Sequence, residues 1–178
     1  MLLVILVTAI VLVGILLAFG TVYLVVSNRN QVPSVSTPQA NMNEAIAALD
    51  LPTNGTFWDL GCGDGGVLAA AIAHSPGLLV KGIENNPALV LLAKMKVGRG
   101  AQVVLGQIEQ VEFGSTDRVY VYLSPKFMAY LEPRFNDQLP KGARIVSQQF
   151  PLPNRTPDRV LDLAAGKAHA EKLYIYDY

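Results

Sequence analysis

The residues best suited to chemistry gather in one short glycine-rich segment, FWDLGCGDGG, at positions 57–66. Three of its glycines have the G-x-G-x-x-G spacing of dinucleotide-binding loops, namely Gly61, Gly63 and Gly66. Two carboxylates, Asp59 and Asp64, flank these glycines. Near a pyrophosphate they would place like charge on like charge, whereas they would attract a cationic ligand. The segment therefore favours a ligand that carries positive charge.

A third acid stands at the end of the next apolar run. Glu84 follows Asp59 by 25 positions, where a carboxylate can accept hydrogen bonds from both hydroxyls of a ribose. NAD sites use the same device, so Glu84 alone does not separate the two cofactors. Together with Asp59 and the acidic loop, it predicts S-adenosylmethionine, whose sulfonium and ammonium are cationic, over NAD. The residues expected to contact this cofactor are Asp59, Gly61, Cys62, Gly63, Asp64, Glu84 and Asn85.

A further contact is expected after the apolar run at 101–105. Gln107 carries an amide whose carbonyl can accept a hydrogen bond from the adenine amino group. Ile108, next to it, would then lie on the adenine ring. Both residues are therefore added to the predicted cofactor site.

The elements that must position these residues alternate between strand and helix. Strand-like runs stand at 56–60, 78–84, 101–105, 117–123 and 143–150, and helical patterns at 39–51, 67–75, 88–100 and 126–139. Pro133 is expected to kink the last of these helices or to start another. Alternation of this kind predicts an α/β fold with a parallel sheet covered by helices. Two final strand-like runs, 159–165 and 172–178, lack a helix between them and predict an antiparallel hairpin at the sheet edge. The layout is that of a Rossmann-like, seven-stranded class I methyltransferase.

The first 27 residues differ from the rest of the chain in composition. No charged side chain precedes Arg29, and about 25 apolar residues would rise about 37 Å as a helix, more than the ~30 Å hydrocarbon core. A cleaved signal peptide would have a basic start and a shorter apolar run, so a retained single-pass transmembrane helix is expected at 1–27. Residues 28–38 are polar and proline-bearing, which is typical of a linker, and 39–178 would form the catalytic domain. Arg29 weakly favours a cytoplasmic domain at the membrane.

Composition excludes some classes of function. Lysine plus arginine equals aspartate plus glutamate at 14 each, so the basic excess of nucleic-acid-binding proteins is missing. The single cysteine, Cys62, cannot form an intrachain disulfide. His74 and His169 lack metal-ligand spacing, so no metal site is expected.

Several longer blocks resemble one family of enzymes. They are VPSVSTP at 32–38, DLGCGDGG at 59–66, GIENNP at 82–87, VYLSP at 121–125 and LPKGARIVSQQFPLP at 139–153. In order and spacing they resemble the membrane-anchored protein-lysine methyltransferases that include those of the ATP synthase c-subunit and the adenine nucleotide translocase, with their prokaryotic relatives. The resemblance covers about 32–178.

The resemblance implies S-adenosylmethionine as methyl donor and lysine side chains of membrane proteins as acceptors. It also implies that the segment at 32–38 lies near the cofactor. Asp59, Gly61, Gly63 and Glu84 carry over directly to cofactor binding. Gln107 stands where the family usually has an acid, which puts the contacts there in doubt.

A lysine acceptor must be neutral to react, although its reference pKa is about 10.4. Desolvation in an acceptor channel lowers that pKa, and the end of the fourth strand is the expected wall. The residues predicted to act there are Tyr122, Ser124 and Pro125. The Ser124 hydroxyl or backbone carbonyls would orient the amine, residues 150–151 would border the channel, and Tyr120 is expected to pack in the core.

Two other functions fit parts of the pattern. A small-molecule or lipid methyltransferase at the membrane would use the same cofactor site. A non-catalytic membrane scaffold with this fold would be expected to have lost Asp59 or Glu84, and both are present.

Overall fold

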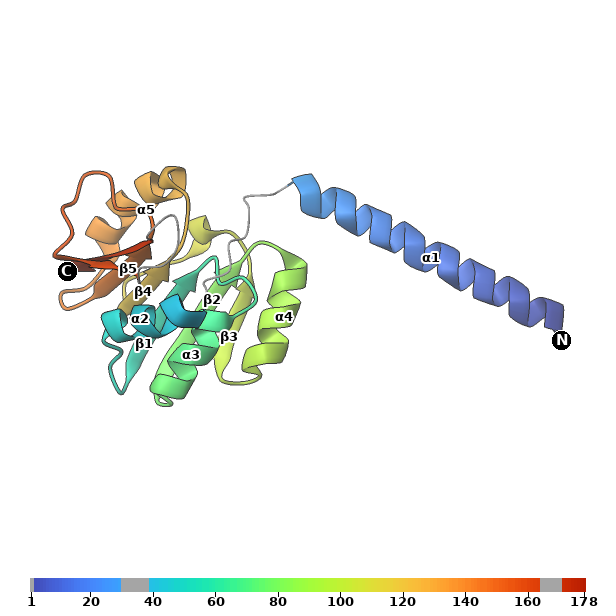
Figure 1. Cartoon of the computed structure of the whole chain (residues 1–178), viewed down its shortest axis with the longest axis horizontal. Helices are drawn as coiled ribbons and strands as arrows, with labels where there is room; N and C mark the ends of the chain where they lie inside the picture. Colours follow the sequence, from blue (N-terminus) through green and yellow to red (C-terminus); the bar gives the residue numbers. More distant parts are fainter. Residues whose placement is uncertain (1, 30–38, 164–170) are drawn as a thin grey trace. The chain divides into compact units, whose positions relative to one another are not determined.

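The computed structural model describes residues 2–29, 39–163 and 171–178. The chain divides into two compact units, Met1–Ser34 and Val35–Tyr178 (Figure 1). Its elements, in order, are α1 (Leu2–Arg29), α2 (Gln39–Leu49), β1 (Gly55–Leu60), α3 (Gly66–His74), β2 (Leu78–Glu84), α4 (Pro87–Val97), β3 (Ala101–Leu105), the 3-10 helix η1 (Ile108–Gln110), β4 (Arg118–Val121), α5 (Pro125–Gln138), β5 (Arg144–Gln148), β6 (Arg159–Asp162) and β7 (Lys172–Asp177).

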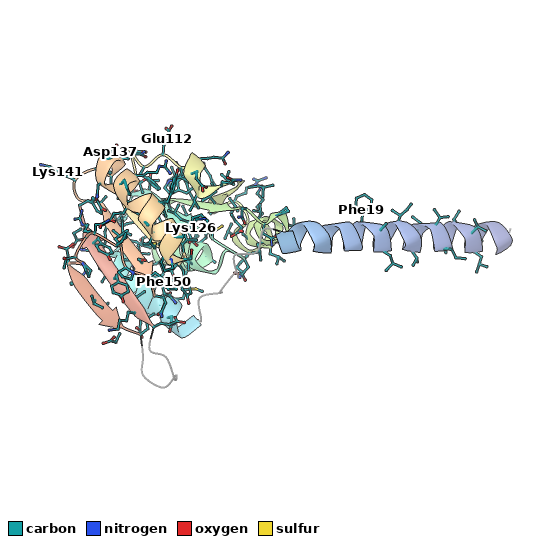
Figure 2. The ribbon with its side chains drawn as sticks, turned by 90° about the horizontal axis from the view of Figure 1, so that it is seen from above. Phe19, Glu112, Lys126, Asp137, Lys141 and Phe150 are labelled. Atoms are coloured by element: carbon teal, nitrogen blue, oxygen red, sulfur yellow. The ribbon has the colours of Figure 1, made fainter. Side chains whose placement is uncertain are left out.

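The first unit contains the long helix α1. Its described large apolar side chains, from Ile5 to Phe19, are exposed; Phe19, for example, projects from the helix and is 74% exposed (Figure 2). Within the part of the chain that the structure describes, no helix meets the length and apolarity needed to cross a membrane. The prediction of a transmembrane helix at 1–27 is therefore not supported.

The second unit is built on one seven-stranded sheet with the order β3-β2-β1-β4-β5-β7-β6. β1 to β5 are mutually parallel, and β7 runs antiparallel to both β5 and β6. The strand order reverses between β1 and β4, which therefore form the topological switch point of the sheet. The predicted Rossmann-like sheet and its antiparallel C-terminal hairpin are confirmed.

Each face of the sheet has its own hydrophobic core. On one face, α2, α3 and α4 pack on the sheet through residues such as Ile46, Leu68 and Ala93. On the other face, α5 and η1 pack through residues such as Leu131 and Ile108. We call these the α2–α4 face and the α5 face. Side chains alternate between the faces along each strand.

Pro133 lies inside α5, which runs without interruption from Pro125 to Gln138. The prediction that Pro133 starts a second helix is therefore wrong. Proline removes one backbone donor from a helix, but Pro133 and Ala129, four residues earlier, are both exposed. The carbonyl of Ala129 can therefore bind water, which reduces the cost of the missing hydrogen bond.

Helix α2 is fixed to the sheet at its C-terminal end. The Arg118 Nε donates hydrogen bonds to the carbonyls of Leu49 at 2.8 Å and Asp50 at 3.0 Å. A guanidinium at this place satisfies carbonyls that a helix end leaves unpaired. Since Arg118 begins β4, the opposite end of α2 points toward the carboxyl edge of the sheet, where the candidate site lies.

Candidate active site

The glycine loop follows β1 at the switch point and takes a conformation that requires glycine. Gly61, Gly63 and Gly65 have φ values of 79°, 54° and 80°, which L side chains rarely adopt. Gly65 also packs closely on α4, because a Cβ there would lie 3.0 Å from Ala93 Cβ. The sequence motif drew attention to Gly66, and it missed the structural requirement for Gly65.

The loop is tied to β2 by its backbone. The amides of Gly61 and Cys62 both donate to the carbonyl of Ile83, at 2.9 and 3.0 Å. A Cβ on Gly61 would lie 3.0 Å from Leu123 Cδ2. The glycine loop therefore lies between the end of β2 and the segment that follows β4.

Glu84 has a carboxylate that is held by backbone amides. Its Oε2 accepts from the Gly63 amide at 3.1 Å, and its Oε1 accepts from the amides of Asn85 and Asn86, each at 2.9 Å. A carboxylate offers about four lone-pair sites, so Oε2 retains acceptor capacity. Glu84 thus joins the glycine loop to the start of α4 and can still accept a hydrogen bond from a ligand hydroxyl.

Asp59 is buried at 3% exposure near the end of β1. Burial, together with the charges of Glu84 and Asp64, raises the pKa of Asp59 to about 8. No hydrogen bond to its carboxylate comes from any residue that the structure describes. A buried carboxylate among other acids is costly unless a cation compensates it. The charge at this site therefore suits a cationic ligand.

Three further residues of the predicted cofactor site have different surroundings. The Cys62 side chain is buried in the core of the α2–α4 face, and burial and the nearby Asp59 raise the pKa of its thiol. Asp64 Oδ2 pairs with Lys96 Nζ at 2.6 Å. Asn85 is exposed at the end of β2. Cys62 is therefore a packing residue below the loop, while Asp64 and Asn85 lie on its outer side.

Gln107 and Ile108 lie after β3, as the sequence indicated. Gln107 is exposed, and its backbone N–H donates a hydrogen bond to Gln110 Oε1 at 3.0 Å. Ile108 is 8% exposed and packs in the core of the α5 face. Most of the Ile108 side chain is therefore used in folding, which leaves little of it for an adenine ring.

The predicted acceptor wall follows β4. Tyr122 is half-buried, and its hydroxyl lies 3.4 Å from Glu171 Oε1; burial and the Glu171 charge raise the pKa of this phenol. Ser124 precedes α5 as its N-cap residue, and Pro125 occupies the first turn. Ser124 is half-buried and Pro125 is exposed. Phe150, which follows β5, is also half-buried and is marked in Figure 2.

The sequence did not reveal the polar side chains that surround Tyr122. Tyr120 is buried, as expected, and its hydroxyl donates to Gln148 Oε1 at 2.5 Å. Gln148 Nε2 and Asn41 Nδ2 each donate to Glu171 Oε2 at 2.6 Å. These residues come from β4, β5, α2 and the start of β7, so no local motif could have found them.

The segment at 32–38, which the resemblance assigns to the cofactor site, lies outside the described residues. Its proposed role is therefore not tested by the geometry.

A family model for the ANTKMT methyltransferase domain matches residues 59–159, from Asp59 to the start of β6. The chain belongs to this family. A comparison with curated proteins found no match.

Solved structures with the same fold bind the expected cofactor. An RNA methyltransferase from Salinibacter ruber in complex with S-adenosyl-L-homocysteine has a TM-score of 0.73 and 26% identity, and the match covers 80% of this chain and 93% of the other. The C-terminal domain of precorrin-6Y C5,15-methyltransferase from Rhodobacter capsulatus has a TM-score of 0.66 and 16% identity, with 80% and 91% coverage. A SAM-dependent methyltransferase from Geobacter sulfurreducens, also with S-adenosyl-L-homocysteine, has a TM-score of 0.58 and 16% identity, with 77% and 58% coverage.

S-adenosylmethionine is the cofactor of this methyltransferase. The site fits it chemically, because Asp59 and Glu84 lie beside a loop of positive-φ glycines, and a cation bound beside Asp59 would favour its ionised form. When bound, the cofactor supplies an electrophilic methyl group on a sulfonium. Asp59 and Glu84 would hold its charged and hydroxyl groups, and the predicted acceptor residues Tyr122 and Ser124 lie in the segment that follows β4.

Proposed function

We propose that the chain methylates lysine side chains of proteins. Membership of the ANTKMT methyltransferase family is the observation that carries this proposal. The matched region includes both Asp59 and Glu84 and the whole segment after β4. The blocks that resemble protein-lysine methyltransferases, among them VYLSP at 121–125, lie in the same region.

The surroundings of Tyr122 support an amine acceptor. Leu123 packs against Gly61, so the acceptor wall is in contact with the cofactor loop. A half-buried aromatic wall removes water from an incoming amine, which lowers the amine pKa and favours the reactive neutral form. Methyl transfer then needs chiefly alignment of nitrogen with the methyl group, which fixed neighbouring elements provide.

The test is methyl transfer by the full-length protein from tritiated S-adenosylmethionine to bacterial membrane proteins, with mass spectrometry of the labelled residues. We expect label on lysine, and its loss in Glu84→Ala, because that variant removes the carboxylate that organises the cofactor loop. Glu112→Gln is the matched control, since Glu112 is exposed and points outward from the domain (Figure 2). Label on no protein, with S-adenosylhomocysteine still bound, would exclude the lysine acceptor.

An RNA acceptor is the second candidate, because the Salinibacter ruber protein is an RNA methyltransferase at 26% identity. The net charge of zero argues against it. Total RNA is therefore assayed in parallel, and label in RNA but not in protein would favour this acceptor class. A lipid extract serves as the third arm, for the small-molecule or lipid alternative.

We also propose that the catalytic unit works at the cytoplasmic face of a membrane. The support is the series of exposed apolar side chains on α1, such as Leu12 and Leu16, which suit contact with lipid. Fractionation of cells tests this. We expect the wild-type chain in the membrane fraction and a Leu12→Lys, Leu16→Lys variant largely in the supernatant. Equal distribution of the two would contradict membrane contact through α1.

A further inference from the structure

The Glu171 carboxylate is the centre of a polar cluster that lies outside the predicted cofactor-binding residues. We name it the Glu171 cluster; its members are Asn41, Tyr120, Tyr122, Gln148 and Glu171. Both nitrogen donors, from Asn41 and Gln148, lie 2.6 Å from Oε2. Tyr122 Oη lies 3.4 Å from Oε1, a long contact. Oε1 therefore has acceptor capacity that the described residues leave largely unused.

Among the residues that the structure describes, no cation forms an ion pair with Glu171. In the described ranges, the ion pairs join Lys or Arg to Asp50, Asp64, Asp162 and Asp177, and none includes Glu171. The described side chains that donate to Glu171 are all neutral. A half-buried carboxylate with neutral donors and no counter-ion attracts a cationic group strongly, because the partly dry surroundings screen it less than water.

The cluster lies beside the methyl-donor site. Tyr122 follows Val121, which pairs in register with Leu60, so Tyr122 lies next to Gly61. Asn41 precedes Met42, whose Cε would lie 2.9 Å from a Cβ on Gly66. Tyr120 pairs with Asp59, and both side chains lie on the α2–α4 face. A group bound at Glu171 Oε1 is thus next to the loop that holds the cofactor.

The neighbouring backbone is strained in a way that packing does not explain. Gln149 has φ 69°, a left-handed conformation that costs a residue other than glycine of the order of 1–2 kcal/mol. Its amide donates to the Lys172 carbonyl at 2.7 Å, which fixes β5 to the residue after Glu171. Gln149 Oε1 is buried and has no hydrogen-bond partner among the described residues. Such strain and such orphaned atoms are concentrated at functional sites.

We propose that Glu171 binds the acceptor nitrogen in its ammonium form and so selects cationic amines as substrates. This inference rests on the proposed lysine acceptor. Asn41 and Gln148 hold the carboxylate in place through Oε2, and Oε1 receives the ammonium. The Tyr122 ring borders the same position and shields it from water.

The contact between the ammonium group and Glu171 also provides an acceptor for the proton that the amine must lose before it reacts. An ammonium N–H proton passes to Glu171 Oε1, which leaves a neutral amine and a neutral carboxyl group. The nitrogen lone pair then forms the new N–C bond while the C–S bond breaks and its electron pair stays on sulfur. The product is a methylated ammonium, and the Glu171 proton returns to solvent.

Titration calorimetry on the full-length protein with S-adenosylhomocysteine tests the proposal. Two probes are compared in the presence of that ligand: Nα-acetyl-lysine methylamide and the uncharged Nα-acetyl-norleucine methylamide. We expect wild-type protein to prefer the lysine probe at least about tenfold, since one hydrogen bond to a charged group accounts for that ratio. Glu171→Gln should bind S-adenosylhomocysteine as before and lose this preference, whereas Glu112→Gln should keep both.

Each outcome separates the inference from the function on which it rests. A Glu171→Gln variant that still prefers the lysine probe overturns the role of Glu171 but leaves the methyltransferase intact. A wild-type protein that binds S-adenosylhomocysteine without distinguishing the probes also overturns it. Failure of the wild-type protein to bind S-adenosylhomocysteine instead contradicts the methyltransferase function itself.

A second measurement avoids any substitution at Glu171. In the wild-type protein, with S-adenosylhomocysteine bound, the Tyr122 ring resonances should shift on addition of the lysine probe and not of the norleucine probe. They are assigned by comparison with Tyr122→Phe. Equal shifts with both probes would overturn the proposal even if Glu171→Gln failed to fold.

Discussion

At the scale of single residues, the buried carboxylate of Asp59 lowers the stability of the folded chain when no ligand is bound. Its pKa is raised from 3.8 to about 8, mainly by burial. Between about pH 4 and pH 8, the carboxyl group is therefore neutral in the folded chain and ionised in the unfolded chain. Stability from this group is fully present below about pH 4 and is lost as the pH rises through 8. A cation bound beside Asp59 would reverse this penalty.

The variant Asp59→Asn tests that account. Without ligand, the free energy of unfolding of the variant should exceed that of the wild type increasingly from pH 5 to pH 8.5, by a few kcal/mol at the upper end. Its affinity for S-adenosylhomocysteine should fall at least about tenfold, because a charged hydrogen-bond partner is removed. Urea unfolding and calorimetry measure the two effects. Parallel pH profiles of the two proteins would contradict a buried, titrating Asp59.

The residues around the cofactor were predictable to different degrees. Asp59 and the loop glycines stand at the end of one apolar run, and Glu84 stands at the end of the next. The sequence therefore predicts their positions at the ends of β1 and β2. Cys62 is in the same motif, but its side chain points into the core, and the spacing of residues does not reveal that. Glu171 lies 112 positions after Asp59, and only the pairing of β5 with β7 brings it to the site.

At the scale of elements, the junction of β2 and α4 joins folding to cofactor binding. Asn86 caps α4, since its Oδ1 accepts from the Ala88 amide at 3.0 Å, and Pro87 occupies the first turn. The Asn86 amide donates to Glu84 Oε1 in turn. The helix cap and the Glu84 carboxylate, which is predicted to bind the ribose, are therefore parts of one hydrogen-bonded turn.

Loss of the Asn86 cap should lower the stability of the domain, while the Glu84 carboxylate keeps its position. Asn86→Ala is expected to lower the free energy of unfolding by about 1 kcal/mol, because one amide of the first turn loses its acceptor. Asn85→Ala is the matched control, as Asn85 is exposed, and should change stability by less than about 0.5 kcal/mol. Denaturant unfolding without ligand compares the variants. Equal stabilities would show that the cap does not contribute.

Strands and helices were predicted well where the apolar pattern was strong. The prediction of a strand at 78–84 agrees with β2 at both ends. The second helix predicted to start at Pro133 was wrong, since α5 continues through this residue; the sequence did not show that Pro133 lies on an exposed face of the helix. The transmembrane helix at 1–27 was inferred from composition alone, and no helix in the described part of the chain meets the length and apolarity of a membrane span.

At the scale of the whole molecule, the free energy of local opening should differ between the central strands and the edge strand of the sheet. Ligand binding should raise it near the glycine loop. The central strands β1 and β4 are buried on both faces, whereas all four residues of β6 are exposed at the sheet edge. Regions with little burial open at low free energy, and buried strands open only with the entire domain. The glycine loop follows β1, one of these buried strands.

Hydrogen exchange monitored by mass spectrometry tests this gradient in the full-length protein. We expect slow exchange in β1 and β4 and fast exchange in β6. S-adenosylhomocysteine should slow exchange at 61–65 and 84–86, because the ligand binds the folded loop and stabilises it by mass action. β6, on the opposite edge of the sheet from β2 and β3, should not change. The same protection in Glu84→Ala as in the wild type would contradict a cofactor site organised by the Glu84 carboxylate, since its hydrogen bonds to Gly63, Asn85 and Asn86 are what join these two segments.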